Sequence, residues 1–356
     1  MRLDSRLAPS KSGHSRHSLT VIASLSMLLL AGVAMGAEPK EWLDRMNKAL
    51  TTRNYVGVFT HVRGTRAETL RIIHRVRGRD VSERLLSLDA SGREFIREGD
   101  ELTCYFPDKR TVLVERRQPD GPLLGALPSL ADGGDSQVYE IRGGERERLL
   151  GRTSRVVALH PRDEYRYGYR LWIDEETYMP LKTQLCDQTG QVIEQILFSS
   201  IDMSDRIPDS MFKPQVDASN YRWLRADRRV ASAASPALWD AMRLPPGFRM
   251  SSRANQALPG SSEPVAHLVF TDGVASVSVF VEARRPNAQA AQGPSRVGSS
   301  SAFTTVVDDH QVTVVGEVPP NTVKFIATQV KSTSPRSTTP PASATEGLGI
   351  APQRRK

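Results

Sequence analysis

The stretch PRDEYRYGYRLWIDEETYMPLKTQLCDQTGQVIEQILFSSI, residues 161–201, decides the fold class. In its first part aromatic and apolar residues alternate with arginines, which is the two-residue period of a β-strand. One predicted face carries Tyr165, Tyr167, Tyr169, Leu171 and Ile173. The other carries Arg166, Gly168, Arg170, Trp172 and Asp174. Further on, LKTQLC and QVIEQILF flank DQTG at 187–190, whose Asp and Gly favour a turn, so the two runs predict a β-hairpin.

Two interpretations of the first strand are open. It can be an ordinary core strand with an exposed polar face. Alternatively, its tyrosine face lines a cavity, because tyrosine combines an apolar ring with a polar tip. The second interpretation makes Tyr165, Tyr167, Tyr169 and Leu171 candidate cavity-lining residues. Neither interpretation makes the stretch an active site.

Short runs rich in β-branched and aromatic residues recur about every ten residues on both sides of a loop at 118–135. This spacing predicts an antiparallel meander over residues 37–216, preceded by an amphipathic helix at 38–52. The loop should hold a short helix near 123–130. The pattern dissolves at 217–236, which predicts a linker to a second domain.

The second predicted domain spans 237–331. It should contain a hairpin around Asp272-Gly273, a second hairpin over 303–318 and a helix from Pro320. The hairpin at Asp272-Gly273 has the strongest short-range signal in the chain. Residues 332–356 are rich in Ser, Thr and Pro, a composition that predicts a disordered tail.

The N-terminus has the features of a secretory signal peptide. A basic lead-in precedes fifteen uncharged residues, Leu19–Val33, and small residues then place the predicted cleavage between Gly36 and Ala37. Fifteen residues are fewer than the roughly 20 that span a membrane, although a retained signal anchor stays open. We therefore expect residues 1–36 to be a leader and the mature protein to be soluble and exported. Cys104 and Cys186 would then meet an oxidising compartment, where they can form a disulfide or stay separate thiols; the sequence does not decide.

No constellation of residues supports catalysis. The sequence has no HExxH, CxxC, GxSxG or phosphate-loop pattern, and no two histidines after the leader stand at metal-ligand spacing. His74 falls on the apolar face of a predicted strand, where we expect a packed histidine rather than a ligand. Neighbouring acids such as Glu175 and Glu176 should point to opposite faces of a strand and serve as solvated surface. The net charge of +8 comes without any nucleic-acid motif, so we expect no nucleic acid. Since metal-ligand and cofactor-binding motifs are missing from the sequence, we expect no metal and no cofactor.

The stretch at 161–201 nevertheless resembles the signature segment of the RseB/MucB family of sigma-E regulatory proteins. Three more segments share the resemblance: EWLDRMNKALTTRNYVGVFTHVRG at 41–64, LPPGF at 244–248, and LVFTDGVASVSVFVE followed by VTVVGEVP. Together they cover about 38–330 in the family's order. The resemblance implies a mainly β fold: a large LolA/LolB-like unclosed antiparallel β-barrel with plugging helices, and a smaller α+β C-terminal domain.

The resemblance also implies a function. Such a protein binds the periplasmic region of an RseA- or MucA-type anti-sigma factor and shields it from site-1 proteolysis. The resemblance places the mature protein in the periplasm, where lipid, lipopolysaccharide fragments or mislocalised lipoproteins are expected to release it. The tyrosine face then becomes a candidate lipid-facing strand: Tyr165, Tyr167, Tyr169 and Leu171. A homodimer is also open. The alternative is a LolA-like periplasmic carrier of lipids or lipoproteins, although the second domain argues against it. An exported hydrolase would need a catalytic constellation that the sequence lacks.

Overall fold

The computed structural model describes residues 38–116, 123–124, 137–226, 239–256, 264–284 and 292–333. The predicted signal peptide at 1–36, including the cleavage point between Gly36 and Ala37, lies outside the described residues. So do most of the predicted tail at 332–356 and residues 227–236 of the predicted linker.

Twelve strands form one sheet in the order β12-β6-β5-β4-β3-β2-β1-β11-β10-β9-β8-β7. Its strands are β1 Tyr55–Arg63, β2 Arg66–Arg77, β3 Asp80–Ser87, β4 Glu94–Glu98, β5 Glu101–Phe106, β6 Thr111–Arg116, β7 Tyr139–Leu149, β8 Arg152–Pro161, β9 Gly168–Asp174, β10 Pro180–Cys186, β11 Val192–Asp202 and β12 Arg222–Ala226. Short 3-10 turns stand at Pro107–Lys109 and Asp209–Phe212. Every neighbouring pair is antiparallel except β12 with β6, which is parallel. The end strands β7 and β12 do not pair with each other, so the predicted mainly β, unclosed architecture is confirmed.

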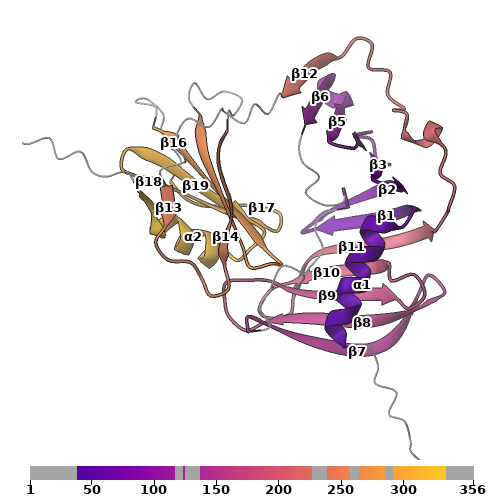
Figure 1. The fold of residues 1–356 in the computed structure, drawn as a ribbon, viewed down its shortest axis with the longest axis horizontal. Helices are drawn as coiled ribbons and strands as arrows, with labels where there is room; N and C mark the ends of the chain where they lie inside the picture. The colour runs from indigo at the N-terminus through magenta and orange to yellow at the C-terminus, as the bar shows by residue number, and fades with distance from the viewer. Residues whose placement is uncertain are drawn as a thin grey trace, which may run out of the picture. The chain divides into compact units, whose positions relative to one another are not determined.

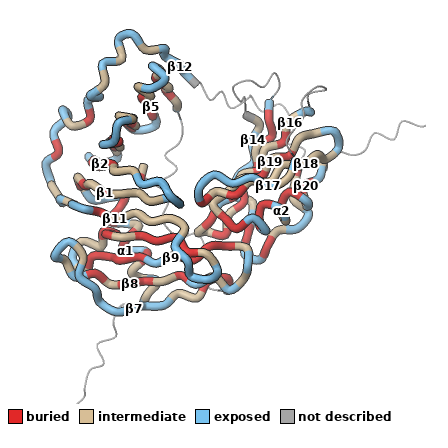
Figure 2. The backbone as a smooth tube through the Cα atoms, turned by 180° about the vertical axis from the view of Figure 1, so that it is seen from behind, coloured by how far each residue is buried: buried red, intermediate tan, exposed pale blue. Residues whose placement is uncertain are grey.

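The predicted N-terminal helix is α1, Pro39–Thr52, and it lies across one face of this sheet (Figure 1). Leu43, Met46 and Leu50 recur at helical spacing and are fully buried against residues of β1, β2, β8 and β9. Glu41 and Arg45 form the i,i+4 ion pair on the solvent side. Figure 2 shows buried residues gathered where α1 meets β8, β9 and β11. One helix therefore closes the main core of the sheet.

The strand expected at 165–173 begins only at Gly168, so the predicted single face of Tyr165, Tyr167, Tyr169 and Leu171 is wrong for its first two members. The reason is local. The Asp163 carboxylate accepts the Tyr165 backbone N–H at 3.0 Å, which holds these residues in a turn before β9.

The arginine side of the same stretch also differs from the prediction. Arg166 is fully buried rather than exposed. Trp172 and Asp174 are buried too, because Trp172 donates to Glu147 at 2.8 Å and Asp174 accepts from Arg152 at 3.2 Å. Arg170, on the same face, is exposed as predicted, so only part of this face is covered by side chains from neighbouring strands.

The hairpin predicted within 181–198 is confirmed by the antiparallel pair β10–β11. Its turn is held by Asp187, whose carboxylate accepts the backbone N–H groups of Thr189 and Gln191 at 2.9 Å each. Gly190 has φ of +84°, a left-handed conformation that glycine adopts without strain.

The C-terminal part is α+β, as predicted. Its six-stranded sheet runs β14-β15-β16-β19-β18-β17, beside a two-stranded pair β13-β20 and the helix α2, Pro320–Gln329. The strands are β13 Trp239–Ala241, β14 Arg249–Gln256, β15 Val265–Thr271, β16 Ser276–Ala283, β17 Gly293–Val297, β18 Ser300–Val307, β19 His310–Gly316 and β20 Val330–Ser332. The hairpin around Asp272-Gly273 is confirmed, with Val277, Val279 and Val281 of β16 in the core and the alternate residues Ser276, Ser278 and Phe280 outside it.

Three expectations about segments need correction or fall outside the described residues. Residues 222–226, assigned to the linker, form β12 and extend the large sheet through β6. Ser332, assigned to the tail, pairs with Trp239. Of the short helix expected near 123–130, only Leu123 and Leu124 are described, and they form a turn.

The two cysteines do not form a disulfide. Both Cys104 on β5 and Cys186 on β10 are buried free thiols. Five strands separate them in the sheet. Since neighbouring strands stand about 4.8 Å apart, the pair lies far beyond the roughly 7 Å between Cα atoms that a disulfide spans.

Candidate functional site

A cavity of about 440 Å³ opens on the face of the large sheet that α1 also covers. Its walls come from β1, β2, β3, β9, β10 and β11, together with Leu123 and Leu124, the turn before β16 and the segment after β19. Apolar side chains dominate the inner wall; they include Phe59, Leu70, Leu85, Leu124, Leu185 and Ile196. Such a cavity, apolar inside and polar at one rim, suits the acyl chain of a lipid.

Only one of the four predicted lipid-facing residues lines this cavity. Tyr169 does so, and burial raises the pKa of its hydroxyl well above the ordinary value, so the group stays a hydrogen-bond donor. Leu171 is fully buried in the core with α1. Tyr167 is also buried, and Tyr165 packs edge-on against Phe325 of α2, with 5.5 Å between the ring centres.

The polar rim joins the large sheet to the C-terminal domain through Glu194 of β11. Its carboxylate receives the Arg63 guanidinium at 3.0 and 3.1 Å and lies 2.5 Å from His61 Nε2. Ser299 Oγ, fully buried, contacts both Glu194 and Glu317 within hydrogen-bonding distance. Although burial raises it, hydrogen bonds from His61, Arg63 and Ser299 lower the pKa of Glu194 to about 2. Burial raises the pKa of Glu317, and the nearby Glu194 carboxylate adds to the rise.

A second contact between the domains centres on Arg166. Its guanidinium donates to Asp163 at 2.9 Å, to Asp272 at 2.7 Å and to the Pro246 carbonyl at 2.5 Å. The side chains of Arg166 and Asp272 are both 0% exposed. Asp272 begins the turn between β15 and β16, and its carboxylate also accepts the backbone N–H groups of Val274 and Ala275. The same carboxylate therefore stabilises the hairpin turn and binds Arg166. Asp163, which turns the chain before β9, therefore also orients the arginine.

A third contact lies beside the second. The Thr322 hydroxyl at the start of α2 donates to the Tyr165 carbonyl at 2.6 Å, and Asn321 donates to Glu164 at 3.0 Å. These bonds explain why the segment before β9 leaves the strand conformation. Its residues face the C-terminal domain instead of continuing the sheet.

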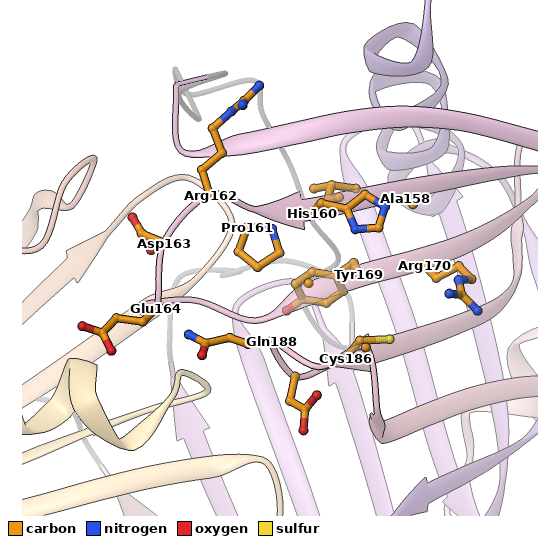
Figure 3. Close-up of a pocket in the computed structure, with 14 residues that line it drawn as sticks. Ala158, His160, Pro161, Arg162, Asp163, Glu164, Tyr169, Arg170, Cys186 and Gln188 are labelled. Carbon is orange, nitrogen blue, oxygen red and sulfur yellow. The ribbon is translucent and has the colours of Figure 1, made fainter.

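A smaller cavity of about 320 Å³ lies where β8, β9 and the β10–β11 turn meet (Figure 3). Arg162, Asp163 and Glu164 reach it from the segment after β8, Arg170 from β9 and Asp187 from the β10–β11 turn, and Tyr169 and Cys186 also line it. Burial raises the pKa of the Cys186 thiol, which keeps it protonated and unreactive. The mixture of charges and the inert thiol give this cavity no defined chemistry.

A buried polar row crosses the large sheet from Tyr55 through His74 and Glu83 to Arg97, each paired with the next across neighbouring strands. His74 stacks on Tyr55 and its Nδ1 lies 2.8 Å from the Arg53 carbonyl, so the predicted packed histidine is confirmed. Glu83 accepts the Leu123 N–H at 3.1 Å, and burial raises its pKa to about 7 despite Arg97. The row thus fixes the segment that contributes Leu123 to the main cavity.

Sequence reasoning missed Glu194, Ser299, Glu317 and the buried role of Arg166. One signal was present: Glu194 and Ile196 fall on the same face of a strand, and an acid on an apolar face needs a partner. Ser299 and Glu317 gave no signal, since their partner is more than 100 residues away. Among the described residues, no cluster of three or more His, Cys, Asp or Glu side chains is arranged to hold a metal ion. No helix within the described ranges is long and apolar enough to span a membrane.

Comparison with known proteins identifies the family. Family models described as the MucB/RseB N-terminal domain and the MucB/RseB C-terminal domain match residues 38–216 and 233–331. The chain belongs to the MucB/RseB family. This is a family of regulatory proteins and not of enzymes. The sigma factor AlgU regulatory protein MucB of Pseudomonas aeruginosa is 31% identical over 319 residues, which cover 86% of this chain and 96% of that protein. The sigma-E factor regulatory protein RseB of Escherichia coli K12 is 27% identical over 323 residues, covering 86% and 94%.

Solved MucB structures share the fold of this MucB/RseB chain. The P. aeruginosa MucA/MucB complex superposes with a TM-score of 0.65 at 26% identity, covering 84% of this chain and 100% of that one. A second structure, MucB with MucA(peri), gives 0.63 over the same share of this chain. MucB by itself gives 0.58 at 27% identity, again over 84% of this chain and 99% of that one.

Proposed function

We propose that this protein is a periplasmic negative regulator of sigma-E-type envelope stress signalling. It binds the periplasmic region of a MucA- or RseA-type anti-sigma factor and shields that region from the first protease. One observation carries the proposal: both domains match the MucB/RseB regulators in order and over almost their full length. The solved structures that the chain resembles include MucB bound to MucA, which lends the proposal support.

The direct test is titration of the mature protein, residues 37–356, with the periplasmic region of a MucA-type anti-sigma factor in a calorimeter. A saturable stoichiometric complex is expected. Addition of the purified protein should then slow cleavage of that region by the site-1 protease. Absence of heat and of a complex in gel filtration would count against the proposal. A complex that leaves the cleavage rate unchanged would retain binding but remove protection.

The releasing signal is proposed to be a lipid whose acyl chain enters the 440 Å³ cavity. The physical basis is that a ligand favouring one conformation weakens partner binding by its difference in affinity for the two. Leu85 lines the cavity, is half-buried and packs against the core, so Leu85→Asp places a charge on the acyl path. We expect it to lose binding of a fluorescent fatty-acid probe.

Leu88 provides the matched control, because it lies three residues further along, is 43% exposed and does not line the cavity. Leu88→Asp should bind the probe as the wild type does. Equal affinity in wild type and both variants would remove the cavity from the proposal. Sedimentation of the purified protein tests the predicted homodimer separately.

A LolA-like carrier of lipid or lipoprotein is the second candidate, favoured by the same apolar cavity. The two functions differ in their partner. A carrier would move lipoprotein between membrane vesicles and show no anti-sigma binding. The C-terminal domain, held to the large sheet through Arg166 and Glu194, favours the regulator.

A further inference from the structure

The contact between Glu194, Ser299 and Glu317 poses a problem of hydrogen counting. Ser299 Oγ lies within hydrogen-bonding distance of one oxygen of each carboxyl group, and the serine is 0% exposed. A hydroxyl carries a single hydrogen and can donate to only one acceptor. Two ionised carboxylates would therefore leave one short contact between two oxygens without a hydrogen, which is repulsive.

The missing hydrogen belongs on Glu317. Glu194 already holds the Arg63 guanidinium in a two-pronged ion pair and contacts His61, and both interactions favour its ionised form. No ion pair reaches the Glu317 side chain among the described residues. A protonated Glu317 can donate to Ser299, which then donates to the Glu194 carboxylate. This order satisfies every group in the contact.

We propose that this contact is a proton-dependent latch between the large sheet and the C-terminal domain, closed when Glu317 carries a proton and opened when it ionises. Ser299 and Glu317 belong to the C-terminal domain, whereas Glu194 and its partners belong to β11 and β1. Opening the latch separates two carboxylates and returns both to water. The charged and titratable groups facing it are His61, Arg63, Glu68, Tyr169 and Asp272.

The contributions of Glu317 and Glu194 to the stability of the closed latch depend on pH in opposite directions. The pKa of Glu317 is raised in the closed form, so its favourable contribution is present at low pH and is lost as the pH rises through the raised value. The pKa of Glu194 is lowered to about 2, so its contribution is lost only as the pH falls toward that value. The latch is thus most stable in mildly acidic solution. Because one proton is involved, the open-to-closed ratio rises by up to about tenfold per pH unit above the open-state pKa of Glu317.

The experiment measures the radius of gyration of the mature protein by small-angle X-ray scattering between pH 5 and 8. The wild type should expand as the pH rises. Glu317→Gln should stay as compact at pH 8 as the wild type is at pH 5, because the amide supplies the hydrogen permanently. Glu194→Gln supplies it from the other side and serves as the second variant if the first does not fold. A wild-type radius that stays constant, or folded Gln variants that keep the wild-type pH dependence, would overturn the proposal.

Two controls separate the latch from its neighbours. His61→Gln removes the other titratable group on Glu194 and should leave the pH dependence in place; its disappearance would assign the proton to His61 instead. Gly298 lies against Arg63, and a Cβ there would stand 2.1 Å from Arg63 Cδ. Because the new Cβ fits only if the Arg63 side chain shifts, Gly298→Ala should weaken the ion pair between Arg63 and Glu194 and leave the latch more open than in the wild type at each pH. No partner is present in these measurements, so the result is independent of the proposed anti-sigma binding.

Discussion

Replacing Arg166 by methionine tests whether the buried ion pair holds the two domains together. Methionine keeps the aliphatic length but removes every hydrogen bond from the guanidinium. The Pro246 carbonyl loses its 2.5 Å donor, and Asp272 loses its only oppositely charged partner among the described residues. The rings of Tyr139 and Phe248 also lose the cation that lies 5.4 and 5.3 Å from their centres.

The expected loss in free energy of unfolding depends on the hydrogen bonds that Asp272 keeps in the variant. Removing one member of a buried ion pair costs about 3–5 kcal/mol, because the other charge stays buried without compensation. Asp272 keeps the N–H groups of Val274 and Ala275 at 2.9 and 2.7 Å and the Tyr139 hydroxyl at 3.3 Å. These donors offset part of the loss, so we expect the lower end of the range, about 3 kcal/mol.

The assay is urea unfolding followed by tryptophan fluorescence, with Trp239 in the C-terminal core and Trp172 in the large sheet as probes. Arg142 is the control: it forms an exposed ion pair with Glu140 on β7, so Arg142→Met should leave the unfolding curve unchanged. A loss below about 1 kcal/mol for Arg166→Met would refute the reasoning, since it would show that Asp272 needs no cation. Adding Asp272→Asn should recover part of the lost stability, because the uncompensated charge is then gone.

Three further results are expected. Glu83→Gln should flatten the fall in stability between pH 4.5 and 7, since burial raises the pKa of Glu83 to about 7 and stability is lost as the acid ionises; thermal unfolding across this range checks it, and a slope equal to that of the wild type would contradict it. Gly316→Ala should destabilise the C-terminal domain by about 1–3 kcal/mol, because the new Cβ would lie 2.7 Å from the Ser276 carbonyl oxygen. Urea unfolding measures this loss, and a variant with the same midpoint urea concentration as the wild type would contradict the expected clash. Finally, the unfolding temperature should not change when a reductant is added, because Cys104 and Cys186 are free; a lower temperature would reveal a disulfide.

The sequence predicted those parts of the fold whose signals are local. The 3.6-residue spacing of Leu43, Met46 and Leu50 predicted α1, and the alternation of Val277, Val279 and Val281 beside Asp272-Gly273 predicted the β15–β16 hairpin. In both cases the periodic face is the one that is buried, so pattern and packing agree. The short spacing between successive strand-like runs was also enough to predict the antiparallel meander.

The prediction failed where residues distant in sequence decide the conformation. Tyr165 and Arg166 continue the strand alternation perfectly, yet bonds to Thr322 and Asp272 draw them out of the sheet. Residues 222–226 have no strong strand pattern and extend the sheet because β6 offers a free edge. The same limit applies to the candidate site: Tyr169 could be proposed from its own strand, whereas Ser299 and Glu317 acquire a role only next to Glu194.

The contacts that join the domains are built largely from carboxylates, guanidinium groups, hydroxyls and backbone carbonyls. A substitution that removes one of these groups leaves its partner buried without a hydrogen bond or an opposite charge, and therefore lowers the stability of the fold. Moving the domains apart is different, because both partners of each polar contact become hydrated together, although the ring contact of Tyr165 with Phe325 is also lost. The chain can thus be intolerant of mutation at Arg166 and still separate and rejoin its two domains reversibly.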